Sequence, residues 1–323
     1  MRILVIQPSN LGDALLTYPA LHALWSATPA AEFHFLASPR NASVFLGDPR
    51  ILRVLIWEKK APLGRLLPLI GLFLGRRFDL IVDFRNSLVP LLQIGARRTR
   101  ILGRSSHLPV HRAQAHLNLV LELGIPPASG SCPLPYGHEE ETELAGRIRP
   151  DQPVVVIVPG ARSHLKRWPA DRFAQVADRL ARDHSAQIVL VGEQSERPIS
   201  EEVRRRMNQP AVDLTGRTTI RLLAALLARA RLVITNDNAC LHAAGIMGVP
   251  TVAIFGPTDE RKYGPRAPGS AVVRRHLVCA PCERALCPYG HECMAWIEPE
   301  EVYRAAAGIL SSAIGASGTG PCE

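Results

Sequence analysis

This sequence of 323 residues lacks a long apolar run. A membrane-spanning helix needs about 20 apolar residues, whereas the run over residues 66–74 is interrupted by Pro68 and Gly71 and is followed by two arginines. The amino terminus turns polar directly after Ile6, where a secretory signal would continue its apolar core. These absences argue against an integral membrane protein and predict a chain that stays in the cytoplasm.

Aromatic residues are also scarce, at 5% of the chain, although the formal net charge is +9. Residues 1–130 hold 15 Lys and Arg against 7 Asp and Glu, so they supply +8 of that charge. The densest basic group, Arg97, Arg98, Arg100 and Arg104, has no aromatic residue within it to stack on bases. We therefore expect no nucleic-acid partner. An anionic membrane face, an anionic substrate and a merely solvated basic surface all remain open.

What is present is the composition of a folded protein, with 47% hydrophobic and 21% charged residues. The length predicts two domains. Seven cysteines, an odd number, argue against a full disulfide framework and favour reduced thiols or a metal site. We find no short-period repeat and no low-complexity segment.

Apolar periodicity predicts strands alternating with helices in both halves, and hence parallel sheets. We expect an α/β protein with two Rossmann-like domains that face each other across a cleft. The first domain takes residues 1–150, the second residues 151–310, and a flexible tail residues 311–323. Strands are expected at 3–7, 33–37, 54–57, 80–84, 100–103, 154–158, 187–191, 211–213, 232–235 and 251–255, and helices at 14–25, 63–74, 88–96, 168–183, 198–208, 220–230 and 239–247.

The first candidate site follows the first expected strand, at Ser9, Asn10, Gly12 and Asp13. Open α/β sheets place reactive groups where a strand ends and a helix begins, so Asp13 should face the cleft. The spacing lacks G-x-G-x-x-G and gives no indication of a dinucleotide. The alternative is that Asp13 only caps the helix.

The second candidate site lies at 159–169, between a strand and a helix, and contains Lys166 and Arg167. Small residues and two cations suit phosphates, although the P-loop spacing is absent. A solvated basic loop over Trp168 is the alternative. Glu193, after the next expected strand, adds a carboxylate that can accept hydrogen bonds from sugar hydroxyls.

The third candidate site runs from Asp237 through Asn238 and Ala239 to His242, again from a strand end into a helix start. Free N–H groups and the helix dipole make such a position a natural anion site. A capping aspartate and a packed histidine are the alternatives.

Taken in order, these motifs resemble those of the ADP-heptose:lipopolysaccharide heptosyltransferases, glycosyltransferase family 9. The matching runs are Gly12-Asp13 with Tyr18-Pro19-Ala20-Leu21, Pro-Gly-Ala with Lys-Arg-Trp-Pro, Thr-Asn-Asp with His242, and Phe255-Gly256-Pro257-Thr258. The late cysteines look most like those of heptosyltransferase II members. The resemblance implies a GT-B fold, acceptor binding in the first domain, donor binding in the second, and an inverting transfer that requires no metal or other cofactor.

The resemblance also implies roles for the candidate residues. Asp13 would be the general base, and Ser9, Asn10 and Gly12 would bind the acceptor. The remaining assignments are Lys166, Arg167, Asn238 and Ala239 for the phosphates, Glu193 for the ribose, and Asp237 and His242 for the donor sugar and phosphate. The chain departs from the family pattern at Asn238-Ala239, where Thr or Ser and Gly are usual, which leaves the exact donor open.

The expected function is transfer of heptose, or a similar sugar, from an ADP-sugar to an anionic lipid-linked saccharide, the lipopolysaccharide inner core. The enzyme would attach peripherally to the cytoplasmic face of the inner membrane. Two alternatives are a non-catalytic basic module at an anionic membrane surface and a GT-B transferase that uses another nucleotide sugar.

Four of the seven cysteines, Cys279, Cys282, Cys287 and Cys293, lie within 15 residues. Four thiolates on a short segment can hold a tetrahedral, structural Zn²⁺. Reduced, packed cysteines, an iron–sulfur cluster and a disulfide pair are the alternatives. Cys240 and Cys322 should not take part.

Overall fold

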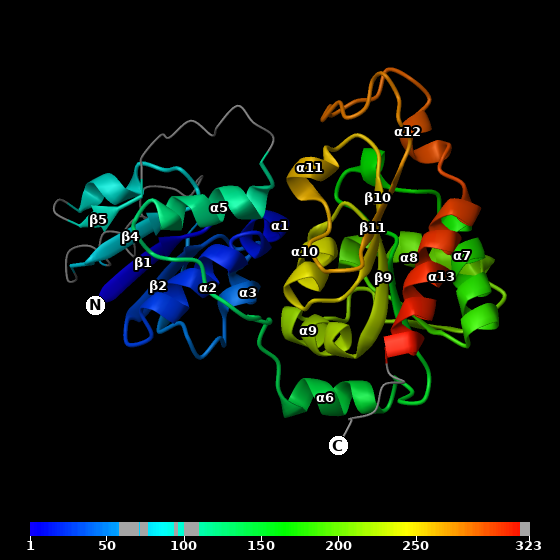
Figure 1. Ribbon diagram of the computed structural model, residues 1–323, viewed down its shortest axis with the longest axis horizontal. Coiled ribbons are helices and arrows are strands. Elements are labelled where there is room, and N and C mark those ends of the chain that lie inside the picture. The colour runs from blue at the N-terminus through cyan, green and yellow to red at the C-terminus, as the bar shows by residue number, and fades with distance from the viewer. Residues whose placement is uncertain (58–70, 72–76, 94–95, 100–109, 317–323) are drawn as a thin grey trace. The chain divides into compact units, whose positions relative to one another are not determined.

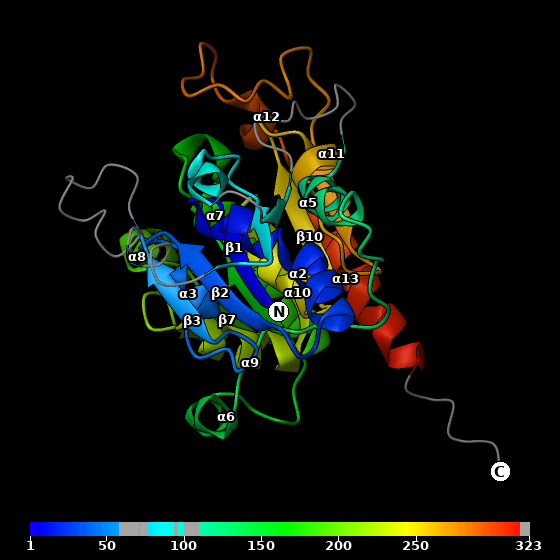
Figure 2. The same cartoon turned by 90° about the vertical axis from the view of Figure 1, so that its left-hand side faces the viewer.

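The computed structural model describes residues 1–57, 71, 77–93, 96–99 and 110–316. The chain forms two compact units, Met1–Cys132 and Pro133–Glu323 (Figure 1; Figure 2). The junction expected near residue 150, from the Pro and Gly content of the preceding segment, therefore lies earlier in the chain. Residues 133–150 belong to the second unit and not to the first. Its helix α6 (His138–Ala145) packs against α9 (Ile220–Arg229), and Glu140 forms an ion pair with Arg221 at 2.7 Å.

The first unit is built on a five-stranded parallel sheet in the order β3-β2-β1-β4-β5. β1 is buried along most of its length because helices and neighbouring strands cover it. The strand expected at 100–103 and nearly all of the helix expected at 63–74 lie outside the described residues. The strands are β1 (Arg2–Ile6), β2 (Glu32–Ala37), β3 (Arg53–Ile56), β4 (Leu80–Asp83) and β5 (Arg97–Arg98).

The helix expected over 14–25 consists of two helices, because the helix is interrupted at Thr17. The Thr17 hydroxyl donates to the carbonyl of Ala14 at 2.7 Å, and Pro19 stands in the first turn of the next helix, where its missing N–H costs nothing. The helix expected at 88–96 is one 3₁₀ turn. The elements are α1 (Leu11–Leu15), α2 (Tyr18–Ala27), α3 (Ala42–Phe45), η2 (Val89–Leu92) and α5 (Arg112–Leu121).

The second unit has a six-stranded parallel sheet in the order β11-β10-β9-β6-β7-β8. The all-apolar β6 is wholly buried, as expected for a central parallel strand covered on both faces. The strands are β6 (Val154–Val158), β7 (Gln187–Leu190), β8 (Ala211–Asp213), β9 (Ala230–Asn236), β10 (Thr251–Phe255) and β11 (Ala271–Arg274).

The four helices expected in the second unit are present as α7, α8, α9 and α10, whereas α6, α11, α12 and α13 are not among the expected helices. α13 runs into the segment expected to be a flexible tail, and residues 317–323 lie outside the described part. The other elements are α7 (Ala170–His184), α8 (Arg197–Arg206), α10 (Ala239–Ile246), α11 (Glu260–Tyr263), α12 (Glu292–Ala295), α13 (Pro299–Ala316), and the 3₁₀ turns η3 (His164–Lys166) and η4 (Gln194–Glu196).

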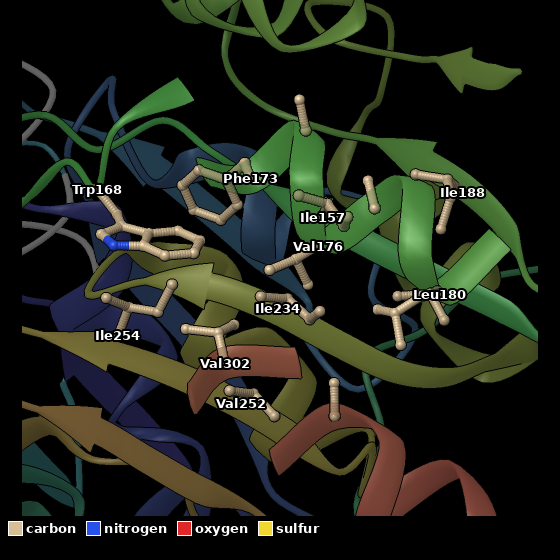
Figure 3. Packing of buried hydrophobic residues seen from close by; sticks show 14 of the residues in the cluster. Ile157, Trp168, Phe173, Val176, Leu180, Ile188, Ile234, Val252, Ile254 and Val302 are labelled. Carbon is tan, nitrogen blue, oxygen red and sulfur yellow. The ribbon is translucent and has the colours of Figure 1, made fainter. Parts of the chain in front are cut away.

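A large apolar cluster lies between this sheet and helices α7 and α13 (Figure 3). Trp168 is 1% exposed and meets Phe173 edge to face, with ring centroids 4.9 Å apart. Its indole N–H donates to the carbonyl of Ile297 at 3.0 Å. The loop after β6 is therefore anchored in the core directly beside Lys166.

Strand order places a topological switch point in each sheet. β1 lies between β2 and β4, and β6 lies between β7 and β9. Ligands of open parallel sheets bind outside the carboxyl ends of strands at such points. None of the helices in the described ranges is long and apolar enough to cross a membrane.

Candidate active site

An ion pair joins the two loops at the switch point of the second sheet. Lys166 Nζ donates to Asp237 Oδ2 at 2.6 Å. Lys166 comes from the turn after β6, and Asp237 follows β9 directly. The Asp237 side chain is only 6% exposed, whereas that of Lys166 is 30% exposed. The carboxylate therefore holds the ammonium group at the mouth of the sheet.

Asn236, the last residue of β9, braces the same two loops. Its amide donates to the carbonyl of Pro159 at 2.8 Å, and its side-chain oxygen accepts from the backbone N–H of Trp168 at 3.1 Å. Arg167 Nε donates to the carbonyl of Ala161 at 2.8 Å, closing the loop on itself. Buried amides that satisfy backbone groups in this way rigidify a loop.

The helix cap at this site is Asn238, and not Asp237. Asn238 Oδ1 accepts from the N–H groups of Cys240 at 3.0 Å and Leu241 at 3.4 Å, while its amide donates to Gly160 at 2.9 Å. Two N–H groups at the start of α10 are thus already bonded. Ala239 and His242, in the first turn of α10, are partly exposed.

Cys240 does not contribute a reactive thiol. The side chain is buried, and burial, with a smaller contribution from the Glu196 carboxylate, raises the pKa of its thiol to about 12. A thiol with so high a pKa stays protonated near neutral pH.

Glu196, which the sequence reasoning missed, lies deeper than Glu193. Glu193 is exposed, whereas Glu196 is 8% exposed and accepts from the Glu193 N–H at 2.9 Å. A Cβ added to Gly160 would lie 2.3 Å from the Glu196 carboxyl carbon. Burial raises the pKa of Glu196. The G-x-x-x-E spacing from Gly192 was available as a signal, but only the fold shows which glutamate points inward.

In the first unit, Asp13 lies in the first turn of α1 at the end of β1. Asn10 is the N-cap residue, and its side-chain amide donates to Asp13 Oδ2 at 3.0 Å. Ser38 Oγ holds the preceding loop by donating to the carbonyl of Ser9 at 2.7 Å. Asp13 is therefore not the cap, and together with Ser9, Asn10 and Gly12 it forms one group at the first switch point.

His116 was also missed, because its helix α5 was not anticipated from the sequence. Burial lowers the pKa of His116 to about 4, and the nearby Asp13 carboxylate opposes that shift. Its ring meets Phe84 edge to face at a centroid distance of 5.3 Å. A neutral imidazole therefore lies near Asp13 at neutral pH.

Four late cysteines border one pocket, which His291 also lines. All four are free thiols, with Cys279 exposed and Cys293 buried. Burial, and then the other three cysteines, raise the pKa of Cys293 to about 11. In the part of the chain that the structure describes, no set of three or more His, Cys, Asp or Glu side chains is arranged to hold a metal ion. Of the other three cysteines, Cys132 ends the first unit, Cys240 lies in α10 and Cys322 lies outside the described residues.

The chain is similar to known proteins along almost all of its length. It is 27% identical over 311 residues to lipooligosaccharide heptosyltransferase 2 of Campylobacter jejuni, covering 94% of this chain and 97% of that protein. The structure of a family 9 glycosyl transferase from Veillonella parvula superposes with a TM-score of 0.83 at 23% identity, covering 96% of this chain and 97% of that one.

The structure of ADP-heptose lps heptosyltransferase II from Escherichia coli gives a TM-score of 0.78 at 22% identity, covering 97% and 99% of the two chains. These likenesses confirm the expected GT-B-type α/β fold. The family model described as glycosyltransferase family 9 (heptosyltransferase) matches residues 106–292, more than half of the sequence. The chain therefore belongs to glycosyltransferase family 9, the heptosyltransferases.

Proposed function

We propose that this enzyme transfers heptose from ADP-heptose to the inner core of lipopolysaccharide or lipooligosaccharide. The observation that carries the proposal is the Lys166–Asp237 pair at the second switch point, in a chain of the heptosyltransferase family. A cation held at the carboxyl ends of parallel strands is placed where a nucleotide diphosphate binds. Relatives named for transfer to lipooligosaccharide support the acceptor class.

Transfer proceeds by direct displacement with inversion. The acceptor hydroxyl oxygen attacks the anomeric carbon and forms the new glycosidic bond, while Asp13 takes the hydroxyl proton. The bond from the anomeric carbon to the phosphate oxygen breaks, and its electron pair leaves with ADP. Asn10, which donates to Asp13 at 3.0 Å, positions the carboxylate, and Ser9 and Gly12 border the acceptor.

Departure of ADP creates negative charge that cations must stabilise. Lys166 moves from Asp237 to the diphosphate, or is shared between them, and Arg167 adds a second positive charge. The start of α10 at Asn238 and Ala239 contributes the helix dipole. These groups supply the stabilisation that a divalent cation supplies elsewhere, so we propose that added Mg²⁺ does not raise turnover.

The other donor contacts are assigned from the positions of the side chains at the ends of the strands. Glu193 is exposed at the end of β7, where its carboxylate can accept from both ribose hydroxyls. Glu196 supports the loop from beneath, against Gly160. Asp237 and His242 face the donor sugar and phosphate from the β9–α10 turn.

The proposed acceptor class explains the excess of basic residues among the first 130 residues. Inner-core acceptors are anionic and lipid-linked, and the net charge of +8 in this segment favours their approach to a peripherally bound enzyme on the cytoplasmic face of the inner membrane.

We also propose that the four late cysteines bind one structural Zn²⁺. Their common pocket and the scarcity of regular structure around them support this, since zinc binding and local folding are coupled in such segments. Metal analysis of untagged protein should find close to one zinc per chain, lost with Cys282→Ser. Less than about a tenth of an equivalent would leave reduced, packed cysteines as the explanation.

The donor is tested by thermal shift against ADP-heptose, ADP-glucose, a UDP-sugar and a GDP-sugar. A true donor raises the melting temperature because it binds only the folded state. We expect the largest shift from ADP-heptose, retained in Asp13→Ala, which removes the base and not the donor site. An equal or larger shift from a UDP- or GDP-sugar would contradict the proposed donor.

A further inference from the structure

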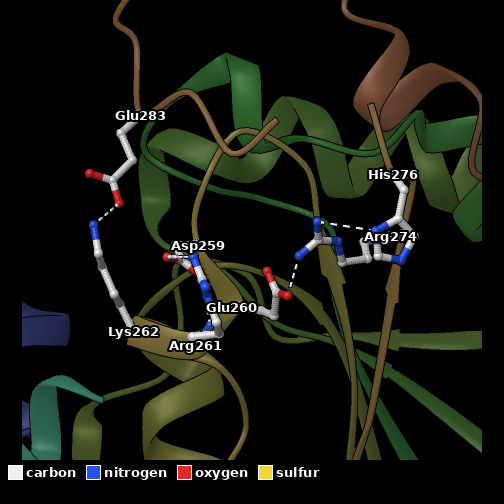
Figure 4. Close-up of polar contacts among 7 residues, drawn as sticks. All are labelled: Asp259, Glu260, Arg261, Lys262, Arg274, His276 and Glu283. Carbon is white, nitrogen blue, oxygen red and sulfur yellow. Dashed lines mark hydrogen bonds and ion pairs between the residues drawn. The ribbon is translucent and has the colours of Figure 1, made fainter. Parts of the chain in front are cut away.

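Arg85, in the first unit, is a partly buried arginine whose guanidinium has no acidic partner in contact with it. Its side chain donates no hydrogen bond and forms no ion pair in the part of the chain that the structure describes. By contrast, Arg274 of the second unit is also partly buried and is paired with Glu260 (Figure 4). The N–H groups of the Arg85 guanidinium are therefore available to a group from outside the chain.

The position of this guanidinium is fixed by an aromatic ring. Its central carbon lies 5.1 Å from the centre of the Trp57 ring, within the range of a cation–π contact. Trp57 in turn packs against an apolar cluster that includes Ile6 and Ile81. A guanidinium held over an anchored ring still donates hydrogen bonds from its edge.

The backbone of Arg85 is fixed by the turn after β4. Asp83 Oδ1 accepts from the N–H of Arg85 at 2.8 Å, and Asp83 Oδ2 accepts from the N–H and the hydroxyl of Ser87, each at 2.7 Å. Burial lowers the pKa of Arg85, and the Asp83 carboxylate opposes that shift. Asp83 therefore offsets part of the positive charge. Because this carboxylate is only 4% exposed, a ligand at this turn would meet the guanidinium and not the carboxylate.

Arg85 and Trp57 meet across the carboxyl ends of β1 and β2. Arg85 follows β4 and Trp57 follows β3, and the sheet order places β1 and β2 between those strands. Three strand spacings, about 14 Å, separate β4 from β3, so the two side chains extend toward each other over this edge. At the same edge the N–H of Phe84 donates to the carbonyl of Ile6 at 3.0 Å, and the chain continues from Ile6 to Asp13. The guanidinium therefore borders the loop that carries the proposed base.

An anionic group of the acceptor is the ligand that fits this placement, and this inference rests on the proposed function. The N–H donors of a guanidinium form a planar fork that matches the oxygens of a carboxylate or a phosphate. We propose that Arg85 binds an oxyanion of the acceptor saccharide, a carboxylate or a phosphate, and thereby selects anionic acceptors. Arg85 contributes to binding, and the proton transfer remains with Asp13.

The test is calorimetric binding of purified inner-core acceptor to the full chain without donor, so that no sugar transfer is needed. Arg85→Gln should weaken acceptor binding about 10- to 100-fold, the range for a hydrogen bond to a charged group. Arg85→Lys keeps the charge and loses the fork, so its affinity should lie between those of wild type and Arg85→Gln. The matched control is Arg53→Gln. Arg53 is exposed at the amino end of β3, at the opposite edge of the sheet, and its loss should leave binding unchanged.

Modified acceptors distinguish a carboxylate from a phosphate. Either the carboxyl-reduced or the dephosphorylated acceptor should bind wild type more weakly than the native acceptor does, and should bind wild type and Arg85→Gln equally. The modification with this effect identifies the oxyanion. Equal affinity of wild type and Arg85→Gln for the native acceptor, the same loss of affinity in Arg85→Gln for every acceptor, or a lower melting temperature of Arg85→Gln would overturn the proposal.

Acceptor binding and sugar transfer can fail independently. A wild type that binds the acceptor through Arg85 and transfers no heptose would contradict the proposed function and leave the role of Arg85 intact. Heptose transfer with the same KM for the acceptor in wild type and Arg85→Gln would contradict the role of Arg85 and leave the proposed function intact.

Discussion

The contact between Lys166 Nζ and Asp237 Oδ2, at 2.6 Å, connects the stability of the second unit with its proposed chemistry. Asp237 is nearly buried, so removing its partner leaves a desolvated charge. The same ammonium group is proposed to stabilise the departing ADP. One residue therefore has two roles that separate variants can distinguish.

Lys166→Ala should lower kcat/KM for the donor about 30- to 1000-fold, the usual effect of about 2–4 kcal/mol of lost charge stabilisation. It should also lower the melting temperature. Lys166→Ala with Asp237→Ala should recover the melting temperature and not the activity, because the stranded charge is gone. Steady-state kinetics and thermal unfolding of the three proteins check this. Full activity in Lys166→Ala would remove Lys166 from the donor site.

Asp13→Asn should reduce turnover by about two to four orders of magnitude while donor binding persists. The amide cannot accept the acceptor proton, although it can still bond to Asn10. Glu32→Gln is the matched control, since Glu32 is a surface carboxylate of the same unit, 51% exposed and paired with Arg2. A variant that unfolds without a specific loss of turnover would assign Asp13 a structural role.

Among elements, the β6 loop depends on close packing between Gly160 and Glu196. Gly160→Ala should destabilise the protein by about 1–3 kcal/mol, because the new Cβ would lie within 2.6 Å of three carboxyl atoms. Glu196→Ala should relieve the clash in the double variant. Gly146→Ala is the control, since nothing lies within 4 Å of its Cβ position. Denaturant unfolding of the wild type, Gly160→Ala, Gly146→Ala and the double variant Gly160→Ala with Glu196→Ala checks this prediction. Equal stability of Gly160→Ala and Gly146→Ala would contradict the close packing.

Helix α5 places His116 where its protonation opposes folding. Its folded pKa of about 4 lies below the unfolded value of 6.5, so the unfolded chain binds the proton first. The free energy of unfolding should therefore fall as pH drops from 6.5 to about 4, by up to about 3 kcal/mol from this group. His116→Gln should lose that part of the pH dependence. Parallel curves for wild type and variant across this range would contradict the buried neutral imidazole.

How far the sequence predicts these elements depends on where the determining contacts lie. Strands such as β6 and β10 are continuous apolar runs, so local composition was sufficient. The break at Thr17 depends on a hydroxyl bonding to Gln7 and Ala14, and α6 is placed by its packing against α9. The choice of Asn238 as cap, and of Glu196 as the inward carboxylate, likewise follows from Gly160, which is remote in sequence.

At the scale of the whole molecule, the candidate residues fall into two groups. Asp13 and its neighbours belong to the unit Met1–Cys132, and Lys166, Asp237 and His242 belong to the unit Pro133–Glu323. The proposed base in one unit and the proposed donor site in the other suit a reaction with two substrates. Variants of the two groups should therefore have different kinetic effects. Asp13 variants should lower turnover, whereas Lys166 variants should lower kcat/KM for the donor.

The most direct measurement is mass-detected transfer of heptose from ADP-heptose to purified inner-core acceptor, with the product's anomeric configuration determined by NMR. The proposed function predicts one added heptose per acceptor, a configuration opposite to that of the donor, and product formation that is nearly abolished in Asp13→Asn. No transfer by the wild type, retention of configuration, or undiminished product with Asp13→Asn would contradict it.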